Sequence, residues 1–332
     1  MKAMIFNAFG APDVLHYEDL PDPVAGPDDL VIEVHAVSVN RVLDVAIRAG
    51  TAPHYGVAPP HVLGVDPSGI VVATGSNVTD FAIGDRVSVT MGMPGGGRYG
   101  IECHGGDAEL TRAPAASCVK VRDEVGFAEA TVISRHGPVA YNLLFNMGEL
   151  KAGQSVLILG AAGNLGSIGI QLAKAAGATV IAAAGSAARA ATGTGLGADH
   201  VIDYSAVNLK DAVMEITGGT GVDLFYDNIA SPETCPLGIE SLKQQGRMVT
   251  AGAHGGPVVP VNFATVYGRQ LTLMGNPRSK AQDALPCFDA AAQGNLKVII
   301  DRVVPLSEAP AMHALMESDP GVGKIILDPT LG

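Results

Sequence analysis

The clearest pattern in the chain is a run of four aliphatic residues, 156–159, that ends in a glycine turn. Four consecutive apolar residues are typical of a parallel strand that is covered on both faces. Gly160, Gly163 and Gly166 follow at a spacing that permits a tight turn and a close approach of the backbone to phosphate. The next residues, 167–176, predict a helix whose N-terminal N–H groups and positive dipole end favour an anion. This pattern predicts a pyrophosphate cradle, and its expected members are Gly160, Ala161, Gly163, Asn164, Leu165 and Gly166.

A glycine triplet alone is weak support for a phosphate site, because many glycine turns bind nothing. The residues that follow strengthen the interpretation, since apolar segments alternate there with helical or turn segments such as 187–192 and 209–217. This alternation favours right-handed parallel crossovers. The expected further strands are 179–184, 200–203, 222–227, 247–251 and 270–274. The centre of the chain is therefore predicted to be an α/β doubly wound parallel sheet of the Rossmann type.

The first part of the chain has a different pattern, with short apolar runs at 30–37, 69–74 and 86–90 between turns rich in proline and glycine. Such spacing is typical of a compact all-β unit with a few helical turns. A helix is expected at 134–145, where the chain enters the nucleotide fold.

The C-terminal segments do not fit neatly onto a six-stranded nucleotide sheet, so we assign them to the first domain. Residues 280–293 predict a helix, and the next segments predict a strand, a helix and a strand at 298–304, 309–317 and 324–327. The expected domains are 1–122 with 278–332, rich in β-structure, and 123–277, which carries the nucleotide fold.

The composition limits the class of protein. The 332 residues are 47% hydrophobic and only 16% charged, which argues against disorder, and no apolar run approaches the roughly 20 residues that cross a bilayer. The formal charge of −12 argues against nucleic-acid binding. We expect a soluble cytoplasmic protein that binds neither nucleic acid nor membrane. The four cysteines are widely spaced and are expected to be reduced thiols: Cys103, Cys118, Cys235 and Cys287.

The end of the second predicted strand indicates which dinucleotide binds. An NAD site has an acidic residue there that hydrogen-bonds the adenosine ribose, whereas this strand ends in Ala183, Ala184 and Gly185. Ser186 and Arg189 can instead bind a 2′-phosphate, which favours NADP(H).

Tyr204, after the third strand, could add its phenol to the same phosphate pocket. The alternatives stay open at these positions. Ser186 could merely cap the next helix, Arg189 could be solvated, and an exposed Tyr204 needs no ligand.

With these motifs in view, the chain resembles the medium-chain dehydrogenase/reductase superfamily over nearly its full length. The supporting stretches in the second domain are GATVI (177–181), LGADHVIDY (196–204) and GVD (221–223). Three stretches of the first domain are similar to the zinc-free quinone oxidoreductase, or zeta-crystallin-like, branch: SVN (38–40), LGVDPSG (63–69) and FAIGDRV (81–87). The resemblance implies a GroES-like catalytic domain, NADPH bound in the cleft beside a Rossmann domain, and a homodimer commonly formed through the sixth strands.

The resemblance also allows a test for zinc. At the positions that match the catalytic ligands of zinc alcohol dehydrogenases this chain has Asn40, Val65 followed by Asp66, and Arg135, which cannot build a zinc site. The region of the structural-zinc lobe offers only Cys103 and His104. We therefore expect no metal.

Without a Lewis acid, the expected reaction is hydride transfer to an acceptor that is already electrophilic, such as a quinone or an α,β-unsaturated carbonyl. The candidate residues on the acceptor side are Asn40, Arg41, His54, Tyr55, Arg135 and His136. Asn40 is expected to hold the substrate or the nicotinamide amide, although it could instead cap a helix that starts near Val42. His54 and Tyr55 could be mobile-loop residues, and His136 could be an ordinary helix-side histidine.

Two segments depart from the family pattern at the acceptor end. Residues 40–50 are one residue longer than usual, with Arg41 in place of a proline, and residues 133–137 carry more charge. Further cofactor contacts are expected at the carboxyl ends of later strands and in the C-terminal segment, namely Asn228, Gly252, Ala253, Asn276 and Lys324. Gly252 could equally be a structural turn.

The leading hypothesis is an NADPH-dependent quinone or enone reductase. The second is a non-catalytic NADPH-binding protein with a structural or regulatory role, because a Rossmann fold does not prove catalysis. A zinc alcohol dehydrogenase is the third.

Overall fold

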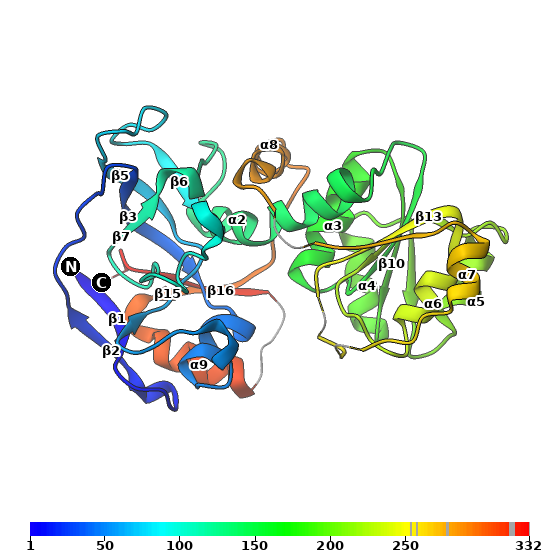
Figure 1. Cartoon of the computed structure of the whole chain (residues 1–332), viewed down its shortest axis with the longest axis horizontal. Coiled ribbons are helices and arrows are strands. Elements are labelled where there is room, and N and C mark those ends of the chain that lie inside the picture. Colours follow the sequence, from blue (N-terminus) through cyan, green and yellow to red (C-terminus); the bar gives the residue numbers. More distant parts are fainter. Residues whose placement is uncertain (253, 257, 277–278, 319–322, 332) are drawn as a thin grey trace. The chain divides into compact units, whose positions relative to one another are not determined.

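The computed structural model describes residues 1–252, 254–256, 258–276, 279–318 and 323–331. The chain forms two compact units, both drawn in Figure 1. Unit 1 comprises Met1–Arg135, Lys280–Ala292 and Val298–Gly332, and unit 2 comprises His136–Ser279 and Gln293–Lys297. The expected domain boundaries at 122/123 and 277/278 stay a prediction, because compact units and domains need not begin at the same residue.

Unit 2 contains the predicted doubly wound sheet. Within the described residues it has six strands in the order β11-β10-β9-β12-β13-β14, and each neighbouring pair is parallel. The strands are β9 (Ser155–Leu159), β10 (Thr179–Ala184), β11 (His200–Asp203), β12 (Val222–Asp227), β13 (Leu242–Thr250) and β14 (Thr272–Gly275). The strand order reverses beside β9, so the carboxyl ends of β9 and β12 flank the crevice where such sheets bind ligands.

The helices of unit 2 lie against this sheet (Figure 1). They are α3 (Asn164–Ala175), α4 (Ala187–Gly195), α5 (Leu209–Ile216), α6 (Cys235–Glu240) and α7 (Phe263–Gly268). One buried apolar cluster includes Leu157 of β9, Ile181 of β10 and Phe225 of β12. The long aliphatic runs therefore form the interior strands, as their lack of polar alternation predicts.

Unit 1 is rich in β-structure. Its larger sheet has the order β15-β16-β3-β5-β6-β8, with β7 paired to β3, and its smaller sheet has the order β2-β1-β4. The strands are β1 (Lys2–Phe6), β2 (Leu15–Asp19), β3 (Asp29–Ser38), β4 (His61–Val62), β5 (Ser68–Thr74), β6 (Arg86–Val89), β7 (Leu110–Pro114), β8 (Cys118–Lys120), β15 (Ile300–Pro305) and β16 (Lys324–Asp328). The C-terminal segment returns to this unit, since β16 pairs with β3.

Further helices complete the structure. The α-helices are α1 (Ala46–Arg48), α2 (Phe127–Tyr141), α8 (Leu285–Ala292) and α9 (Ala309–Ser318), and two π-helices are η2 (Arg41–Val45) and η6 (Asn142–Met147). Single 3-10 turns are η1 (Pro12–Val14), η3 (Pro53–Tyr55), η4 (Pro94–Gly96), η5 (Ala115–Ser117), η7 (Ala281–Ala284) and η8 (Leu306–Glu308).

Several predicted boundaries are wrong. The helix expected at 134–145 begins at Phe127, since the residues before 134 contain no glycine or proline, and it gives way to a π-helix at Asn142. The helix expected from 167 begins at Asn164, because Gly163 already occupies the N-cap position. The strand expected from 247 begins at Leu242.

The extra residue predicted between Asn40 and Gly50 coincides with the π-helix η2. The N–H of Val45 donates to the carbonyl of Asn40, five residues earlier, at 3.3 Å. A π-turn holds one residue more than an α-turn, and such turns occur often at functional sites. The wider turn of η2, next to Asn40, therefore accommodates the extra residue of this segment.

Candidate functional site

The glycine turn of unit 2 has the geometry of a phosphate cradle. Gly160 has φ of +76°, which is the left-handed region that glycine adopts without strain. A Cβ on Gly166 would lie 2.1 Å from the carbonyl oxygen of Gly160, so only glycine fits there. The turn N–H of Gly163 donates to the same carbonyl at 2.9 Å. The turn is thus held tightly against the start of α3.

The first residues of α3 complete this cradle. Asn164 and Leu165 begin the helix, and Gly163 at its N-cap offers no side-chain cap for the free N–H groups. The carbonyl of Leu165 accepts a hydrogen bond from the Tyr226 hydroxyl at 3.1 Å, which ties the helix start to β12. The N–H of Ala161 donates to Ala183 at 3.3 Å, which joins the turn to the end of β10.

The end of β10 brings together three of the predicted 2′-phosphate residues. Ser186 is the N-cap of α4, and its oxygen accepts from the N–H of Arg189 at 3.4 Å, so the capping alternative is observed. The ring of Tyr204 packs over Gly185, where an added Cβ would meet Cε2 at 3.1 Å. Burial raises the pKa of Tyr204, and the nearby Arg189 guanidinium opposes that rise. The Tyr204 phenol therefore lies beside Gly185, within electrostatic range of the Arg189 guanidinium.

The later strand ends place further predicted contacts near the cradle. The buried Asn228 donates through Nδ2 to the Leu159 carbonyl at 3.2 Å. Among the described residues, Oδ1 of Asn228 has no hydrogen-bond partner and remains an available acceptor. A Cβ on Gly252 would lie 2.4 Å from the Asn228 carbonyl, so its turn is structural as well. Oδ1 of Asn276 accepts from Nδ2 of Asn142 at 3.0 Å. Ala253 lies outside the described residues.

Unit 1 contains a buried set of polar residues that we call the Asn40 cluster: Ser38, Asn40, Asp44, Asp66 and Lys324. Nδ2 of Asn40 donates to the Ser38 carbonyl at 3.1 Å and to Oδ2 of Asp66 at 3.2 Å. Its Oδ1 accepts from Nζ of Lys324. Asp66 also accepts from the N–H and Oγ of Ser38, at 2.9 and 2.6 Å. The side chain of Asn40 is thus held from both ends. Asn40 occupies the N-cap position of η2, as the capping alternative predicts, but its side chain makes no capping hydrogen bond.

Burial and charge shift the pKa values in the Asn40 cluster. Burial raises the pKa of Asp44 to about 6, with the Asp66 carboxylate adding to the rise. Burial lowers the pKa of Lys324 to about 8, against the attraction of Asp66. Burial also raises the pKa of the neighbouring Asp107 carboxyl well above its usual range, with Asp44 and Asp66 acting in the same direction. Perturbed groups of this kind concentrate at functional sites, although structural clusters also produce them.

Arg135 lies next to the Asn40 cluster. Thr131, one turn earlier on α2, donates through its hydroxyl to the Asp66 carbonyl, and residues four apart share one face of a helix. The Arg135 charge also contributes to lowering the pKa of Lys324. Among the described residues, the buried Nε of Arg135 has no hydrogen-bond partner. His136 follows on α2 and is partly buried.

The remaining predicted residues lie elsewhere in unit 1. Arg41 is exposed at the start of η2. His54 and Tyr55 form a single 3-10 turn and stack with ring centroids 4.3 Å apart. The Arg98 guanidinium lies 5.1 Å from the Tyr55 ring centroid. No hydrogen bond links Tyr55 or Arg41 to the Asn40 cluster within the described part of the chain.

Three members of the Asn40 cluster, Ser38, Asp44 and Asp66, were not among the predicted site residues. The signal for Asp44 was the extra residue in its segment: the π-turn carries the buried Asp44 back so that its Oδ2 accepts from the N–H of Asn40 at 2.7 Å. Ser38 ends β3 directly before this turn. Lys324 was expected at the cofactor, whereas its Nζ contacts Asn40 and the Val39 carbonyl; a cofactor contact stays a prediction.

Unit 1 also has a cavity of about 650 Å³, lined in part by Met93, Cys103 and Leu110. None of the predicted site residues lines it, so it is separate from the Asn40 cluster. The four cysteines are free thiols, as expected. Across the described residues, no group of three His, Cys, Asp or Glu side chains is arranged to hold a metal ion, and no helix is long and apolar enough to span a membrane.

Comparisons with known proteins agree with this architecture. Residues 26–123 match the model of the alcohol dehydrogenase GroES-like domain, and residues 164–292 match that of the zinc-binding dehydrogenase family. The chain is 32% identical to a 2-haloacrylate reductase of a Burkholderia species, with 99% of both chains covered. It is 29% identical to a quinone oxidoreductase of Pseudomonas aeruginosa, again over 99% of both. The crystal structure of AibC superposes with a TM-score of 0.93 at 27% identity, covering 99% of this chain and 95% of AibC.

Proposed function

Because the chain belongs to the medium-chain dehydrogenase/reductase superfamily, in the branch of the quinone oxidoreductases, we propose that it reduces quinones or α,β-unsaturated carbonyl compounds. Membership makes it an oxidoreductase with a nicotinamide cofactor. We propose that this cofactor is NADPH and that the reaction does not use zinc. The observation that carries this proposal is the pair of sites described above. Unit 2 has a dinucleotide cradle without an acidic residue at the end of β10, and unit 1 has Asn40, Val65 and Arg135 where zinc ligands would be expected.

The choice of NADPH rests on the end of β10. A carboxylate there would repel a 2′-phosphate, and this strand offers Gly185 and Ser186 instead. Arg189 supplies a fixed positive charge and Tyr204 a hydroxyl donor, and the two are close enough to affect each other electrostatically. A guanidinium with a phenol suits a phosphate monoester better than a ribose hydroxyl.

The cradle residues fit the rest of a dinucleotide. Gly160 and Gly166 allow the backbone to approach a pyrophosphate, and the N-terminus of α3 favours its charge. The free Oδ1 of Asn228 suits a hydroxyl donor such as a ribose. When bound, NADPH supplies the hydride.

The acceptor side needs groups that stabilise the negative charge that hydride transfer creates. Arg135 and Lys324 are the cations beside Asn40, and both can stabilise an oxyanion electrostatically. Asn40 fixes the position of Lys324, because its Oδ1 accepts from the ammonium. The relatives named above are reductases of a haloacrylate and of quinones, which are unsaturated acceptors.

The absence of zinc rests on residue chemistry. An amide, a valine and a guanidinium do not coordinate Zn²⁺ as thiolates and imidazoles do. The zinc alcohol dehydrogenase hypothesis therefore requires a set of ligands that these positions do not offer. Stoichiometric zinc in the purified protein by elemental analysis would contradict the proposal.

The main competing hypothesis is a dinucleotide-binding protein that does not catalyse hydride transfer. The decisive experiment measures oxidation of NADPH, with NADH in parallel, over a panel of 1,4-quinones and enones, with and without a chelator. We expect saturable turnover that prefers NADPH and is unaffected by the chelator. Tight NADPH binding without turnover on any acceptor would favour the competing hypothesis, and equal rates with NADH would contradict the role of Arg189.

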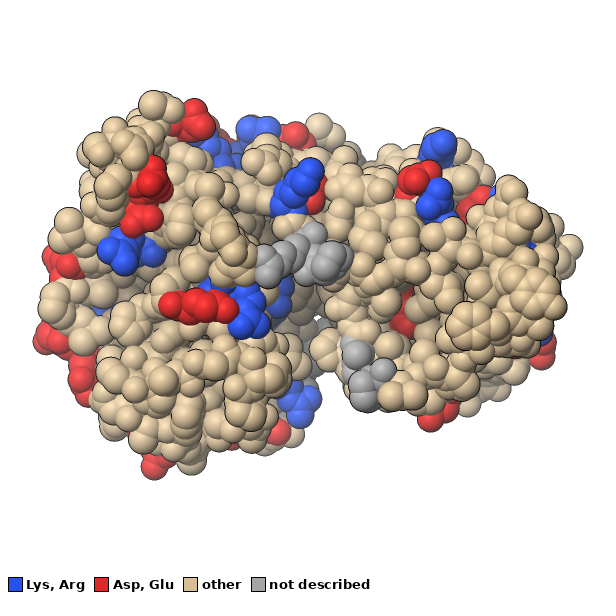
Figure 2. Space-filling view, in the orientation of Figure 1, with Lys and Arg blue, Asp and Glu red and all other residues tan. Residues whose placement is uncertain are grey.

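We also propose that the protein is a homodimer that pairs through β14. This strand ends the sheet order, and within the described residues no strand pairs with its outer edge. Phe263 and Tyr267 of the adjacent α7 are 72% and 78% exposed. Figure 2 shows that the surface over α7 carries few charges. Exposed aromatic residues beside an unpaired edge are typical of an interface.

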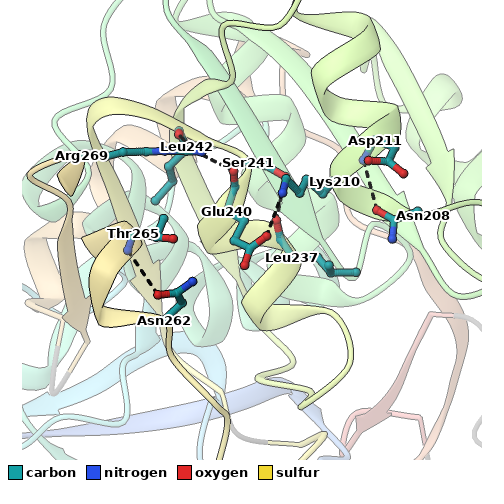
Figure 3. A network of polar contacts seen from close by, with 10 residues as sticks. All are labelled: Asn208, Lys210, Asp211, Leu237, Glu240, Ser241, Leu242, Asn262, Thr265 and Arg269. Carbon is teal, nitrogen blue, oxygen red and sulfur yellow. Dashed lines mark hydrogen bonds and ion pairs between the residues drawn. The ribbon is translucent and has the colours of Figure 1, made fainter. Parts of the chain in front are cut away.

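The position of α7 is fixed from both ends. Oδ1 of Asn262 accepts from the N–H of Ala264 at 3.0 Å and caps the helix. Nη1 of Arg269 donates to the carbonyls of Glu240 and Leu242, each at 2.8 Å (Figure 3). The exposed aromatic side chains are therefore presented by an ordered helix. The cytoplasmic location stays a prediction.

A further inference from the structure

The Arg135 guanidinium lies beside the Asn40 cluster, and no hydrogen bond to the described residues uses its donors. A guanidinium carries five N–H donors. The structure records no hydrogen bond or ion pair from the Arg135 side chain to any described residue, and its Nε is buried. An unpaired buried donor costs free energy, and a guanidinium meets carboxylates with two parallel hydrogen bonds.

The hydrogen bonds of the carboxylates in the Asn40 cluster come from groups other than Arg135. Asp66 accepts from Ser38 and Asn40. Oδ2 of Asp44 accepts from the N–H of Asn40, and its buried Oδ1 has no hydrogen-bond partner among the described residues. Burial and the nearby Asp44 and Asp66 charges raise the pKa of the Asp107 carboxyl well above its usual range.

Asn40 has no amide group left to donate hydrogen bonds to the acceptor. Its Nδ2 donates to Ser38 and Asp66, and its Oδ1 accepts from Lys324, so its amide is used within unit 1. Lys324 is fully buried and also contacts the Val39 carbonyl. An ammonium has three N–H donors, so at most one donor of Lys324 is left for a ligand. Within the described residues, the larger donor capacity left at this cluster is that of the Arg135 guanidinium.

We infer that the acceptor is an anion, an α,β-unsaturated carboxylate whose carboxylate group binds the Arg135 guanidinium. This inference rests on the proposed function, and it narrows the acceptor class from neutral quinones and enones to unsaturated acids. Lys324 is the second cation at this cluster and interacts electrostatically with Arg135. Its charge adds to the positive potential that attracts an anionic acceptor.

The reaction explains why such an acceptor needs this cation. The hydride of the reduced nicotinamide nucleotide adds to the β-carbon, and the electron pair of the carbon–carbon double bond moves onto the carboxylate. The carboxylate thereby gains a second negative charge, which Arg135 neutralises. A proton from water then adds to the α-carbon, so the products are the saturated acid and the oxidised nucleotide.

The test compares a 2-substituted acrylate with its neutral methyl ester in the wild-type protein and in Arg135→Gln. We expect the substitution to lower kcat/KM for the acid by about 100-fold and to change that for the ester less than about threefold. Arg135→Lys should restore only part of the loss, because an ammonium cannot bind a carboxylate through two parallel bonds. Arg302→Gln is the matched control, because Arg302 is exposed on β15 and pairs with Asp301.

A second measurement does not depend on turnover. The saturated acid should raise the thermal unfolding midpoint of the wild-type protein and of Arg302→Gln, in the presence of NADP⁺, and should have no effect on Arg135→Gln. Unfolding of Arg135→Gln without ligand checks that the variant is folded.

The outcomes separate this inference from the proposed function. Turnover of quinones and enones without turnover or binding of the acids would overturn the inference and leave the function intact. No turnover on any acceptor would contradict the function itself. The inference would also be overturned if Arg135→Gln lowered kcat/KM equally for the acid and the ester. It would be overturned as well if kcat/KM for the acid fell in Arg41→Gln but not in Arg135→Gln.

Discussion

The Lys324 ammonium donates a hydrogen bond to Oδ1 of Asn40, although 284 residues separate the two in sequence. Both side chains are buried, and the pairing of β16 with β3 brings them together. The bond fixes the orientation of the Asn40 amide, so that Nδ2 faces Ser38 and Asp66. A segment at the end of the chain thereby sets the geometry of a loop near its beginning.

The first prediction concerns the proton on Lys324. Burial lowers its pKa to about 8, so the protonated form that holds Asn40 is lost as the pH rises through that value. We expect kcat/KM of the wild-type protein to fall above pH 8. Lys324→Met should be about tenfold slower below that pH, and its kcat/KM should not fall above it. Rate profiles against pH check this. Lys120→Met, an exposed lysine paired with Asp85, should keep the wild-type profile.

The second prediction concerns cofactor choice. Arg189→Ala should raise KM for NADPH by about 10- to 100-fold and leave KM for NADH nearly unchanged, because only NADPH has a 2′-phosphate for the guanidinium. Tyr204→Phe should have a smaller effect in the same direction. Steady-state kinetics with both nucleotides check this. Lys174→Gln, which loses a surface pair with Asp199, serves as the control.

The third prediction concerns the glycine turn. Gly166→Ala places a Cβ 2.1 Å from the Gly160 carbonyl, so the turn must shift, and we expect a loss of about 2 kcal/mol of stability together with loss of cofactor binding. Gly195→Ala is the matched control, because nothing lies within 4 Å of its Cβ. That change should be neutral or stabilising by about 0.5–1 kcal/mol. Denaturant unfolding and nucleotide titration measure both effects.

The fourth prediction concerns acid stability through His313 of α9. This histidine is buried, and neither ring nitrogen has a partner among the described residues. Burial and the Arg48 charge lower its pKa to about 3. The unfolded chain binds a proton near pH 6.5 and the folded chain does not, so stability falls as the pH drops from 6.5 towards 3.

This depressed pKa should cost about 2 kcal/mol of stability at pH 5. His313→Leu should therefore lose less stability between pH 7 and pH 5 than the wild-type protein does. Denaturant unfolding at the two pH values measures the difference. His16→Leu, at an exposed position of β2, should show the wild-type dependence. An unchanged dependence in His313→Leu would contradict the prediction.

The fifth prediction concerns assembly. Tyr267→Glu places a charge on the exposed face of α7, and we expect it to convert a dimer into a monomer. Sedimentation velocity measures the change. Val207→Glu also alters an exposed apolar residue of unit 2 but lies away from α7 and β14, and it should leave the dimer intact. A monomeric wild-type protein would contradict the proposal.

Local patterns predicted the doubly wound sheet well. The strands β10, β11 and β12 have the predicted bounds, because long apolar runs flanked by turn residues can be buried in few other ways. Helix starts were predicted less well, since α2 begins seven residues before the expected position. Residues 127–133 contain neither glycine nor proline, so the sequence shows no sharp helix start there.

The candidate site was only partly predictable. The glycines of the cradle are visible in sequence, because their spacing is local and their role depends on the missing Cβ. The Asn40 cluster is different, since its members come from β3, the π-helix η2, the segment that contains Asp66, and β16. No local rule reports that a lysine near residue 324 reaches an asparagine at residue 40.

Four features can be predicted from the chain without its fold: the type of sheet, the glycine turn, the lack of an acidic residue after β10, and the lack of zinc-ligand chemistry at three positions. These features depend on residue type and short spacing. Which polar groups find hydrogen-bond partners within the protein depends on the folded chain. Among the described residues, the Asn40 amide has partners and the Nε of Arg135 has none, because hydrogen-bond partners are set by long-range packing rather than by neighbours in the chain.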